Sequence, residues 1–380
     1  MRVLQLGKFY PIRGGVEKVM WDLTAHLPEA GVACDMLCAI LPGDKPDPQD
    51  ASYARTEGGV LVFSLPSGGR VFCVKALAKK AATMLSPAMV GWLRKHKGSY
   101  DIIHVHHPDP MAAMALRLSG FKGKVVLHWH SDILSQKGLL RLYRPLQNWL
   151  IRRADVIVGT TPVYIKSSPW LQDCQKKCTF VPIGIDPLPE GEPVRIRNRY
   201  PCEVMVLSVG RLVPYKGYSC LVDAAAFLPD GWKVIIGGNG PLQAALQEQI
   251  RAKGLEGKVE LAGYLPQEDI PSWFAACDVF VLSSVLKTEA FGIVQIEAMS
   301  QGKPVVTTLV PGSGMSWVNA HGESGLNVPP GDPKAMAQAL VEVAGEKEKY
   351  GKAALERFRE LFTTECMINK VKAIYEAQMV

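Results

Sequence analysis

The sequence predicts an α/β protein built from two doubly wound domains, in which helices cover both faces of a mostly parallel sheet. The chain has 380 residues, which exceeds the size at which one hydrophobic core keeps growing, so two domains are expected. Short apolar runs alternate with amphipathic stretches along the chain, as parallel strands alternate with crossover helices. This rhythm stops once, over residues 184–202, and then starts again.

In the first half, four apolar runs predict strands and three amphipathic stretches predict helices. The strand segments are VLQLG, IIHVH, VVLHWH and ADVIVGT, and the helical segments are Val16–Leu27, Met111–Leu118 and Leu139–Ile151. Ser86-Pro87 and Asp109-Pro110 each predict a helix start, because a capping side chain precedes a proline at the first helical position.

The second half repeats the pattern after a break. Residues 184–202 contain four prolines and are the best candidate for an interdomain linker. Strands are then predicted in EVMVLSVG, WKVIIGG, KVELAG, DVFVLSS and KPVVTT. We therefore divide the chain into domains at 1–185 and 186–360, followed by a C-terminal segment at 361–380.

Composition indicates a folded, water-soluble chain. Hydrophobic residues make up 48% and charged residues 21%, near the average of globular proteins. The apolar stretch at the start is too short for a signal peptide, and no run of 18 apolar residues occurs, so we expect a cytoplasmic protein. Nine scattered cysteines suit a reducing compartment. Cys34/Cys38 and Cys174/Cys178 have CxxxC spacing, but no partner pair follows them, so zinc is not expected.

Basic residues are concentrated in the first half. Residues 1–185 hold 24 Lys and Arg against 13 Asp and Glu, whereas residues 186–380 hold 19 against 23. Two acid-free segments, which we expect to be helical, contain Trp92 and Trp149 among cations. Contact with an anionic membrane is one interpretation, and an ordinary solvated face is the other. These cations are Arg70, Lys75, Lys79, Lys80, Arg94, Lys95, Lys97, Lys137, Arg141, Arg144, Arg152 and Arg153.

The carboxyl ends of the predicted strands are where a doubly wound sheet binds ligands. After EVMVLSVG, Arg211 and Lys216 stand at the two ends of a turn that enters a helix, which predicts an anion site for a diphosphate. The glycine turn at residues 237–241 lets backbone approach a ligand, with Gly238 and Asn239 as candidate contacts. No GxGxxG fingerprint occurs, which disfavours a nicotinamide dehydrogenase.

The segment EAFGIVQIE, from Glu289 to Glu297, is the most informative. Read as one helix, it places the two carboxylates about 12 Å apart along the axis. Such carboxylates suit the hydroxyls at two ends of an elongated ligand, and the N–H groups near Gly292 suit phosphates between them. A sugar nucleotide has that shape.

Five motifs in order resemble glycosyltransferase family 4, the large retaining class with the GT-B fold of two Rossmann-like domains facing a central cleft. They are GGVEK, VPIGID, GRLVPYKG, GGNGP and EAFGIVQIEAM. The resemblance implies an N-terminal acceptor-binding domain and a C-terminal nucleotide-sugar-binding domain. It also implies a final helix, at about 363–378, that crosses back to the N-terminal domain, with Phe362 and Tyr375 as packing residues.

The resemblance also implies roles for single residues. Arg211 and Lys216 would neutralise the departing diphosphate, Glu289 would hold the donor sugar and Glu297 the ribose. His130 would lie near the donor sugar and the reacting centre, whereas the role of His128 stays open. The predicted catalytic residues are His130, Glu289, Arg211 and Lys216, and the predicted donor-binding residues are Gly15, Arg211, Lys216, Gly238, Asn239, Glu289, Phe291, Gly292, Ile293 and Glu297.

The mechanism is predicted to need no metal and no bound cofactor. The chain contains no DxD motif, so the two cations must balance the diphosphate. Neither family glutamate is placed in relatives for a double displacement. A front-face path is the alternative, in which the leaving phosphate oxygen takes the proton of the acceptor hydroxyl. In this path His130 positions and polarises the reacting groups and is not a nucleophile.

The remaining histidines are candidates for acceptor contact. His104 and His106 share one face of a strand and could form a metal pair, but only Asp109 lies near them in the sequence, so metal binding is not expected. The predicted acceptor-binding residues are Gly14, His107 and Asp109.

Other functions fit the sequence less well. A nucleic-acid binder leaves Glu289 and Glu297 unexplained, a phosphorylase would need a pyridoxal lysine, and a GT-B epimerase is the nearer rival. The stretch at residues 311–333 resembles enzymes that build bacterial surface polysaccharides, often mannosyltransferases. We therefore expect GDP-mannose as donor and a glycan or lipid-linked acceptor. UDP-glucose, UDP-galactose and UDP-N-acetylglucosamine remain alternatives.

Overall fold

A computed structural model describes residues 1–12, 14–47, 50–80, 83–134 and 137–380. The chain divides into two compact units. The N-terminal unit comprises Met1–Pro182 together with Thr364–Val380, and the C-terminal unit comprises Ile183–Thr363. The first of these boundaries lies three residues before the division that we placed after residue 185.

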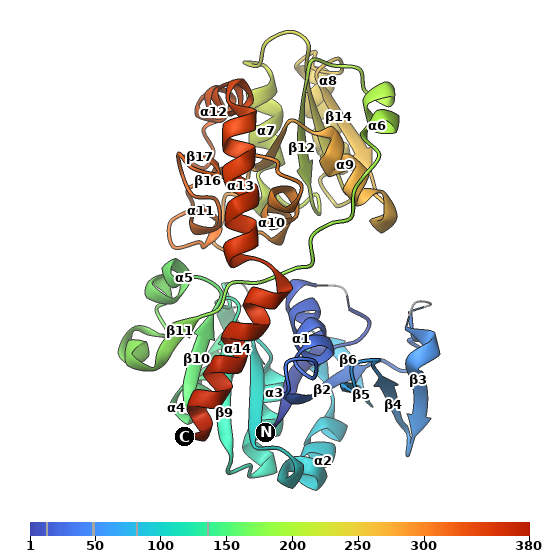
Figure 1. Ribbon diagram of the computed structural model, residues 1–380, viewed down its shortest axis with the longest axis vertical. Coiled ribbons are helices and arrows are strands. Elements are labelled where there is room, and N and C mark those ends of the chain that lie inside the picture. Colours follow the sequence, from blue (N-terminus) through green and yellow to red (C-terminus); the bar gives the residue numbers. More distant parts are fainter. Residues whose placement is uncertain (13, 48–49, 81–82, 135–136) are drawn as a thin grey trace. The chain divides into compact units, whose positions relative to one another are not determined.

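The N-terminal unit is built on one nine-stranded sheet (Figure 1). All of its strand pairs are parallel except those that β4 makes with β3 and β5. In sheet order the strands are β11 (Cys178–Phe180), β10 (Val156–Gly159), β9 (Lys124–Trp129), β8 (Ile102–His107), β1 (Arg2–Phe9), β2 (Ala33–Ile40), β5 (Arg70–Lys75), β4 (Val60–Ser64) and β3 (Ala54–Glu57).

Three helices of this unit, Gly15–His26, Pro110–Ser119 and Lys137–Arg153, form where the apolar periodicity predicts them, whereas Pro162–Ser167 was not predicted. A separate hairpin of β6 (Ala78–Lys80) and β7 (Thr83–Leu85) was not predicted. The final helix belongs to this unit, as expected, and begins one residue later than predicted. The helices are α1 (Gly15–His26), α2 (Pro87–His96), α3 (Pro110–Ser119), α4 (Lys137–Arg153), α5 (Pro162–Ser167) and α14 (Thr364–Met379).

The C-terminal unit contains a six-stranded, fully parallel sheet (Figure 1). Numbered along the unit, its order is 3-2-1-4-5-6, the doubly wound arrangement that reverses direction beside the first strand. In sheet order the strands are β14 (Val259–Gly263), β13 (Trp232–Gly237), β12 (Val204–Val209), β15 (Val279–Leu282), β16 (Val305–Thr308) and β17 (Gly325–Val328).

The helices of this unit enclose an apolar core centred on β12, β13 and β15. Val206, Val234 and Val281 in these strands are fully buried. The α/β class and the doubly wound arrangement predicted from sequence are thereby confirmed. The helices are α6 (Pro193–Arg199), α7 (Tyr218–Ala225), α8 (Gln243–Ala252), α9 (Ile270–Ala276), α10 (Ile293–Ser300), α11 (Met315–Val318), α12 (Pro333–Gly345) and α13 (Lys347–Leu361).

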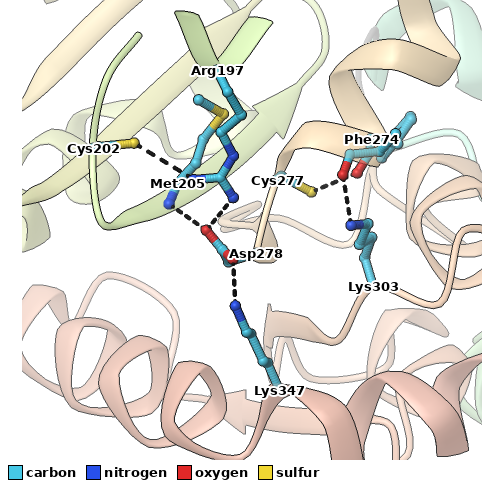
Figure 2. Close-up of polar contacts among 9 residues, drawn as sticks. Arg197, Cys202, Met205, Phe274, Cys277, Asp278, Lys303 and Lys347 are labelled. Carbon is cyan, nitrogen blue, oxygen red and sulfur yellow. Dashed lines mark hydrogen bonds and ion pairs between the residues drawn. The ribbon is translucent and has the colours of Figure 1, made fainter. Parts of the chain in front are cut away.

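A buried carboxylate joins the start of the C-terminal unit to its sheet and to α13. Asp278 lies directly before β15 and accepts hydrogen bonds from Arg197 on α6 (2.6 Å), the Met205 N–H (2.8 Å) and Lys347 on α13 (2.8 Å), as Figure 2 shows. Burial acts to raise the pKa of Asp278, but these three donors outweigh it and lower the pKa. Part of the predicted linker is therefore helix α6, which is bound to the C-terminal unit through the Arg197–Asp278 ion pair.

The helix starts predicted at Ser86-Pro87 and Asp109-Pro110 are confirmed, but two local details of the predictions are wrong. Ser86 precedes α2 but does not cap it, because its hydroxyl donates to the carbonyl of Lys75 (2.7 Å). The first basic segment is not wholly helical, since Arg70, Lys75 and Lys79 lie on strands, and Arg70 forms an ion pair with Asp35 (3.0 Å). The side chains of Lys80 and Lys137 lie outside the described part of the structure.

Candidate active site

The turn after β12 forms the first part of the candidate donor site. Arg211 follows it with an exposed side chain, and a short 3-10 turn, Pro214–Lys216, leads to Gly217. A Cβ atom on Gly217 would lie 2.1 Å from the carbonyl oxygen of Ser283, and its φ is +68°. Only glycine fits there, so the turn is held against the end of β15 and Lys216 is carried with it.

Lys216 and Glu289 meet in this site. The Nζ atom of Lys216 lies 2.6 Å from Oε2 of Glu289, and both side chains are largely buried. The Oγ atom of Ser284 lies 3.4 Å from the same carboxylate oxygen, and the Ser313 hydroxyl donates to the Glu289 carbonyl. A cation and an anion predicted from separate motifs are therefore neighbours, whereas Arg211 makes no ion pair with any residue that the structure describes.

The prediction that Glu289 and Glu297 share one helix is wrong. Helix α10 begins at Ile293, so Glu289 lies in the loop before it and only Glu297 lies on the helix. The helix starts late because Gly292 has φ +77°, a left-handed conformation outside the helical range. The N-terminus of α10 opens beside the Glu289 loop, which leaves its N–H groups near the predicted phosphate position.

Close backbone packing explains the glycine turn after β13. A Cβ atom on Gly238, whose φ is +133°, would lie 2.0 Å from the carbonyl oxygen of Gly210. The neighbouring Asn239 is exposed, and its carbonyl accepts the N–H of Leu212 (3.0 Å). The predicted donor contacts Gly238 and Asn239 thus adjoin the Arg211 turn, while Phe291 is buried against Phe362, with ring centroids 6.0 Å apart.

The predicted acceptor residues of the N-terminal unit differ in accessibility. Gly14 and Gly15 are exposed at the start of α1. His107 is fully buried, with its ring stacked on Trp129 at 3.7 Å between centroids. Asp109 caps α3 by accepting from two N–H groups of that helix, and it also accepts the N–H of Lys8. The structure therefore does not support acceptor contact by the side chains of His107 and Asp109.

Four histidines stack along the second half of β8 and β9: His104 and His106 lie on β8, His128 lies on β9 and His130 directly follows it. The closest ring centroids, those of His128 and His130, are 4.0 Å apart, and the rings of His104 and His128 are tilted by only 8°. Burial holds the pKa of His104, His106 and His130 well below the ordinary value and lowers that of His128 to about 3. All four rings are neutral at physiological pH.

A metal fits this cluster poorly. One nitrogen from each of His104, His106 and His128 lies within 4.8 Å of the other two. Metal binding needs three lone pairs that converge on one point about 2 Å away, whereas nearly parallel rings direct them side by side. Both nitrogens of His106 are also engaged in hydrogen bonds.

Sequence reasoning did not single out the side chains that support these groups. Gln5, Ser284 and Ser313 lie outside the motifs, and their roles depend on contacts between segments far apart in the chain. Tyr375 was predicted to pack, and it is fully buried, but it also makes two polar contacts. A buried Gln in a strand is the one signal that sequence could have offered.

Comparison with known proteins identifies the class to which this fold and site belong. Residues 14–182 match the family described as glycosyl transferase 4-like domain, and residues 195–356 match glycosyl transferases group 1. O-antigen chain mannosyltransferase C of Escherichia coli is 32% identical over 385 residues, covering 99% of this chain and 98% of that protein. D-rhamnosyltransferase WbpZ of Pseudomonas aeruginosa is 32% identical over 373 residues, covering 96% and 92%.

Solved structures agree on the fold. Sucrose-phosphate synthase from Thermosynechococcus elongatus superposes with a TM-score of 0.76 at 21% identity, covering 100% of this chain and 99% of that one. Anabaena Alr3699/HepE in complex with UDP and glucose gives 0.75 at 22% identity, covering 99% of each. The fold is therefore GT-B.

The chain belongs to glycosyltransferase family 4. It is similar over nearly its whole length to a mannosyltransferase of the O-antigen chain and to a D-rhamnosyltransferase. Within the described residues, no helix has the length and apolar composition needed to span a bilayer.

Proposed function

We propose that the protein transfers mannose from GDP-mannose to a growing, lipid-linked or polysaccharide acceptor, with retention of the anomeric configuration. The Lys216–Glu289 pair at the end of the C-terminal sheet is the observation that carries the proposal, because it combines a cation for phosphate with a carboxylate for sugar hydroxyls. The mannosyltransferase from Escherichia coli, which covers 99% of this chain, supports the choice of sugar.

Lys216 and Glu289 would bind different parts of the donor. Lys216 would turn its ammonium toward the diphosphate, and the N–H groups at the start of α10 would add donors for the phosphate oxygens. Glu289 would then accept hydrogen bonds from the sugar hydroxyls. Ser284 and Ser313 would keep its loop in place while the lysine moves.

Metal independence is part of the proposal. Arg211 is exposed beside the turn that carries Lys216 and would supply the second positive charge for the leaving diphosphate. Two fixed cations can stabilise the charge that develops on the phosphate without a metal ion. His130 would act on the sugar as a neutral hydrogen-bond partner.

Product analysis tests the proposal. The enzyme is incubated with GDP-mannose, UDP-glucose, UDP-galactose or UDP-N-acetylglucosamine, in EDTA or magnesium, with and without a mannose-containing lipid acceptor. We expect an α-linked mannosyl product when acceptor and GDP-mannose are both present and not when either is missing. The product should form in EDTA as well as in magnesium. Transfer from a UDP-sugar alone would replace the donor, an inverted linkage would reject retention, and a C2 epimer formed without acceptor would indicate an epimerase.

Peripheral contact with an anionic membrane is the second proposal, and it rests on α4. This 17-residue helix contains no acidic residue, and its exposed positions include Arg141, Leu142, Arg144 and Arg152. Leu142 is 80% exposed and lies between cations, and interfacial helices combine an apolar side chain with flanking cations in this way. Membrane contact through α4 would place the enzyme where a lipid-linked acceptor is found.

Vesicle flotation tests this contact. The protein should float with vesicles that contain anionic phospholipid, and it should stay behind with neutral vesicles. Leu142→Glu should reduce the bound fraction about tenfold, because it loses apolar burial and adds repulsion near the surface. Val341→Glu, at another exposed apolar position in the C-terminal unit, is the control. Equal flotation of both variants would reject α4 as the contact.

A further inference from the structure

A chain of hydrogen bonds connects Gln5 to His130 inside the N-terminal unit. Gln5 lies on β1 and is fully buried. Its Oε1 atom is 2.8 Å from Nε2 of His106, and Nδ1 of His106 is 2.9 Å from Nε2 of His130. His130 is therefore two hydrogen bonds away from the amide.

The surroundings of Gln5 decide which way its amide points. The Nε2 atom lies 3.0 Å from the Tyr375 hydroxyl and 3.4 Å from the Cys34 sulfur, so each of its two N–H bonds has an acceptor. With the amide reversed, its nitrogen would face His106, and one N–H bond would lose its partner inside the core, which is unfavourable. The oxygen therefore faces His106.

The protonation of both histidines follows from this orientation. An amide oxygen only accepts, so the proton of His106 is on Nε2. Burial keeps His106 and His130 neutral, so each ring carries one proton. Nδ1 of His106 then accepts, Nε2 of His130 donates, and Nδ1 of His130 is left with a lone pair.

That nitrogen differs from the others in the cluster. The Nε2 atom of His104 and both ring nitrogens of His128 are fully enclosed without partners. Nδ1 of His130 is not among these enclosed atoms, and it has no hydrogen-bond partner within the described residues. It is thus the one nitrogen of the four rings with both a free lone pair and access from outside.

We infer that Gln5 is a positioning residue which, through His106, holds His130 in the tautomer that carries its proton on Nε2 and offers Nδ1 as an acceptor to a sugar hydroxyl. The contribution to transfer rests on the proposed function, whereas the tautomer does not. Helix α14 takes part, because Tyr375 accepts from Gln5 and donates to Nδ1 of His104 at 2.6 Å.

Nitrogen-15 NMR of the histidine-labelled full chain at neutral pH tests the tautomer, since protonated and unprotonated ring nitrogens have well-separated shifts. The signals of His130 are assigned by their loss in His130→Gln. We expect Nδ1 of His130 to be unprotonated in the wild-type protein. A protonated Nδ1 would overturn the inference without any variant.

Three variants test the role of Gln5. Gln5→Met removes the acceptor, so the two nitrogens of His130 should move toward averaged shifts, and kcat should fall about tenfold because one neutral hydrogen bond biases an equilibrium by roughly that factor. Tyr375→Phe should have a smaller effect in the same direction. Gln5→Glu presents only acceptor oxygens to His106, so it should keep the wild-type tautomer of His130 as long as His106 carries a single proton, which the shifts of His106 report.

The control is Ser119→Ala, which removes a buried hydroxyl of the same unit that bonds to the Leu116 carbonyl and the Phe121 N–H at the end of α3. It should change neither the His130 shifts nor kcat, and the affinity for nucleoside diphosphate should be unchanged in every variant. Wild-type shifts in Gln5→Met, or normal kcat with altered shifts, would overturn the positioning role. If the shifts behave as expected but no nucleotide sugar is a substrate, the proposed function fails and the tautomer assignment stands.

Discussion

The carboxyl ends of the two sheets carry opposite kinds of polar chemistry. In the C-terminal unit, Lys216 and Glu289 are charged, paired at 2.6 Å and partly open to solvent. In the N-terminal unit, four stacked histidines are buried and held neutral. Both edges are where a doubly wound sheet binds ligands. One edge is therefore suited to a charged diphosphate and the other to neutral hydroxyl groups.

Removing the carboxylate of the charged edge should have the largest effect. Glu289→Ala is expected to lower kcat about 10²–10³-fold, because charge-assisted contacts to the reacting sugar are lost, while the melting temperature stays near that of the wild type. Initial rates with saturating donor measure the effect. Glu248→Ala removes an exposed carboxylate paired with Arg251 and is the matched control. Near-normal turnover of Glu289→Ala would refute the site.

Removing the cation should weaken binding more than turnover. Lys216→Ala is expected to raise the Kd for a nucleoside diphosphate about 10–100-fold, the effect of one hydrogen bond from a charged group. Isothermal titration in EDTA measures it. Lys253→Ala, which breaks an exposed pair with Asp223, should leave the Kd unchanged, and equal affinities for both variants would contradict the assignment of the diphosphate to Lys216.

Asp278 is a charged group with a structural role in the same unit as the candidate donor site. Asp278→Asn should lower the free energy of unfolding by about 1–3 kcal/mol at pH 7, since hydrogen bonds from charged donors are weakened. The folded-state pKa of Asp278 is lowered, so its stabilisation is present above the unfolded value of about 3.9 and is lost as the pH falls through the folded pKa.

Urea titrations of both proteins between pH 3 and pH 7 measure this difference. The difference between the two free energies of unfolding should become smaller toward the acid end of the series. A difference that stays constant over the whole range would show that the Asp278 charge does not stabilise the fold. The kcat of Asp278→Asn at pH 7 should equal that of the wild type.

The neutral edge should give the smallest effect, a flat pH profile. An exposed histidine titrates near pH 6.5, but burial holds the pKa of His130 well below that value, so it stays neutral and kcat should change little between about pH 6 and 8. Initial rates at saturating substrate check this. A fall in kcat with a midpoint near 6.5 that is absent from His130→Gln would show that His130 is exposed to water and titrates normally.

Local pattern was sufficient to predict the fold class. The strands around IIHVHH and DVFVLSS are fully buried apolar runs between amphipathic helices, which is a strong signal for parallel sheets. The predictions omit β2 to β7, β11 and β17. The strands β3 to β7 are short, mix polar with apolar residues and include antiparallel pairs, and β11 and β17 have only three and four residues, whereas β2 is a long buried run that its own pattern does signal. The identity of the short strands depends on partners across the sheet rather than on their own periodicity.

The candidate site was predictable where backbone geometry dictates residue type. Gly217, Gly238 and Gly292 all have positive φ, and this is why the motifs around them contain glycine. The position of Glu289 outside α10 was not predictable, because a single left-handed residue ended the apparent periodicity. The Gln5–His106–His130 chain was not predictable either, since it joins three strands whose register only the folded sheet defines.

Nucleotide binding in the presence of EDTA shows whether the Lys216–Glu289 pair belongs to a donor site. A ligand that binds the folded protein raises its melting temperature, so GDP and GDP-mannose should stabilise the wild-type protein without metal, and this stabilisation should be lost in Lys216→Ala. Stabilisation by UDP compounds alone would change the donor and leave the site intact. No stabilisation by any nucleotide or nucleotide sugar would contradict the assignment of the charged edge as a donor site.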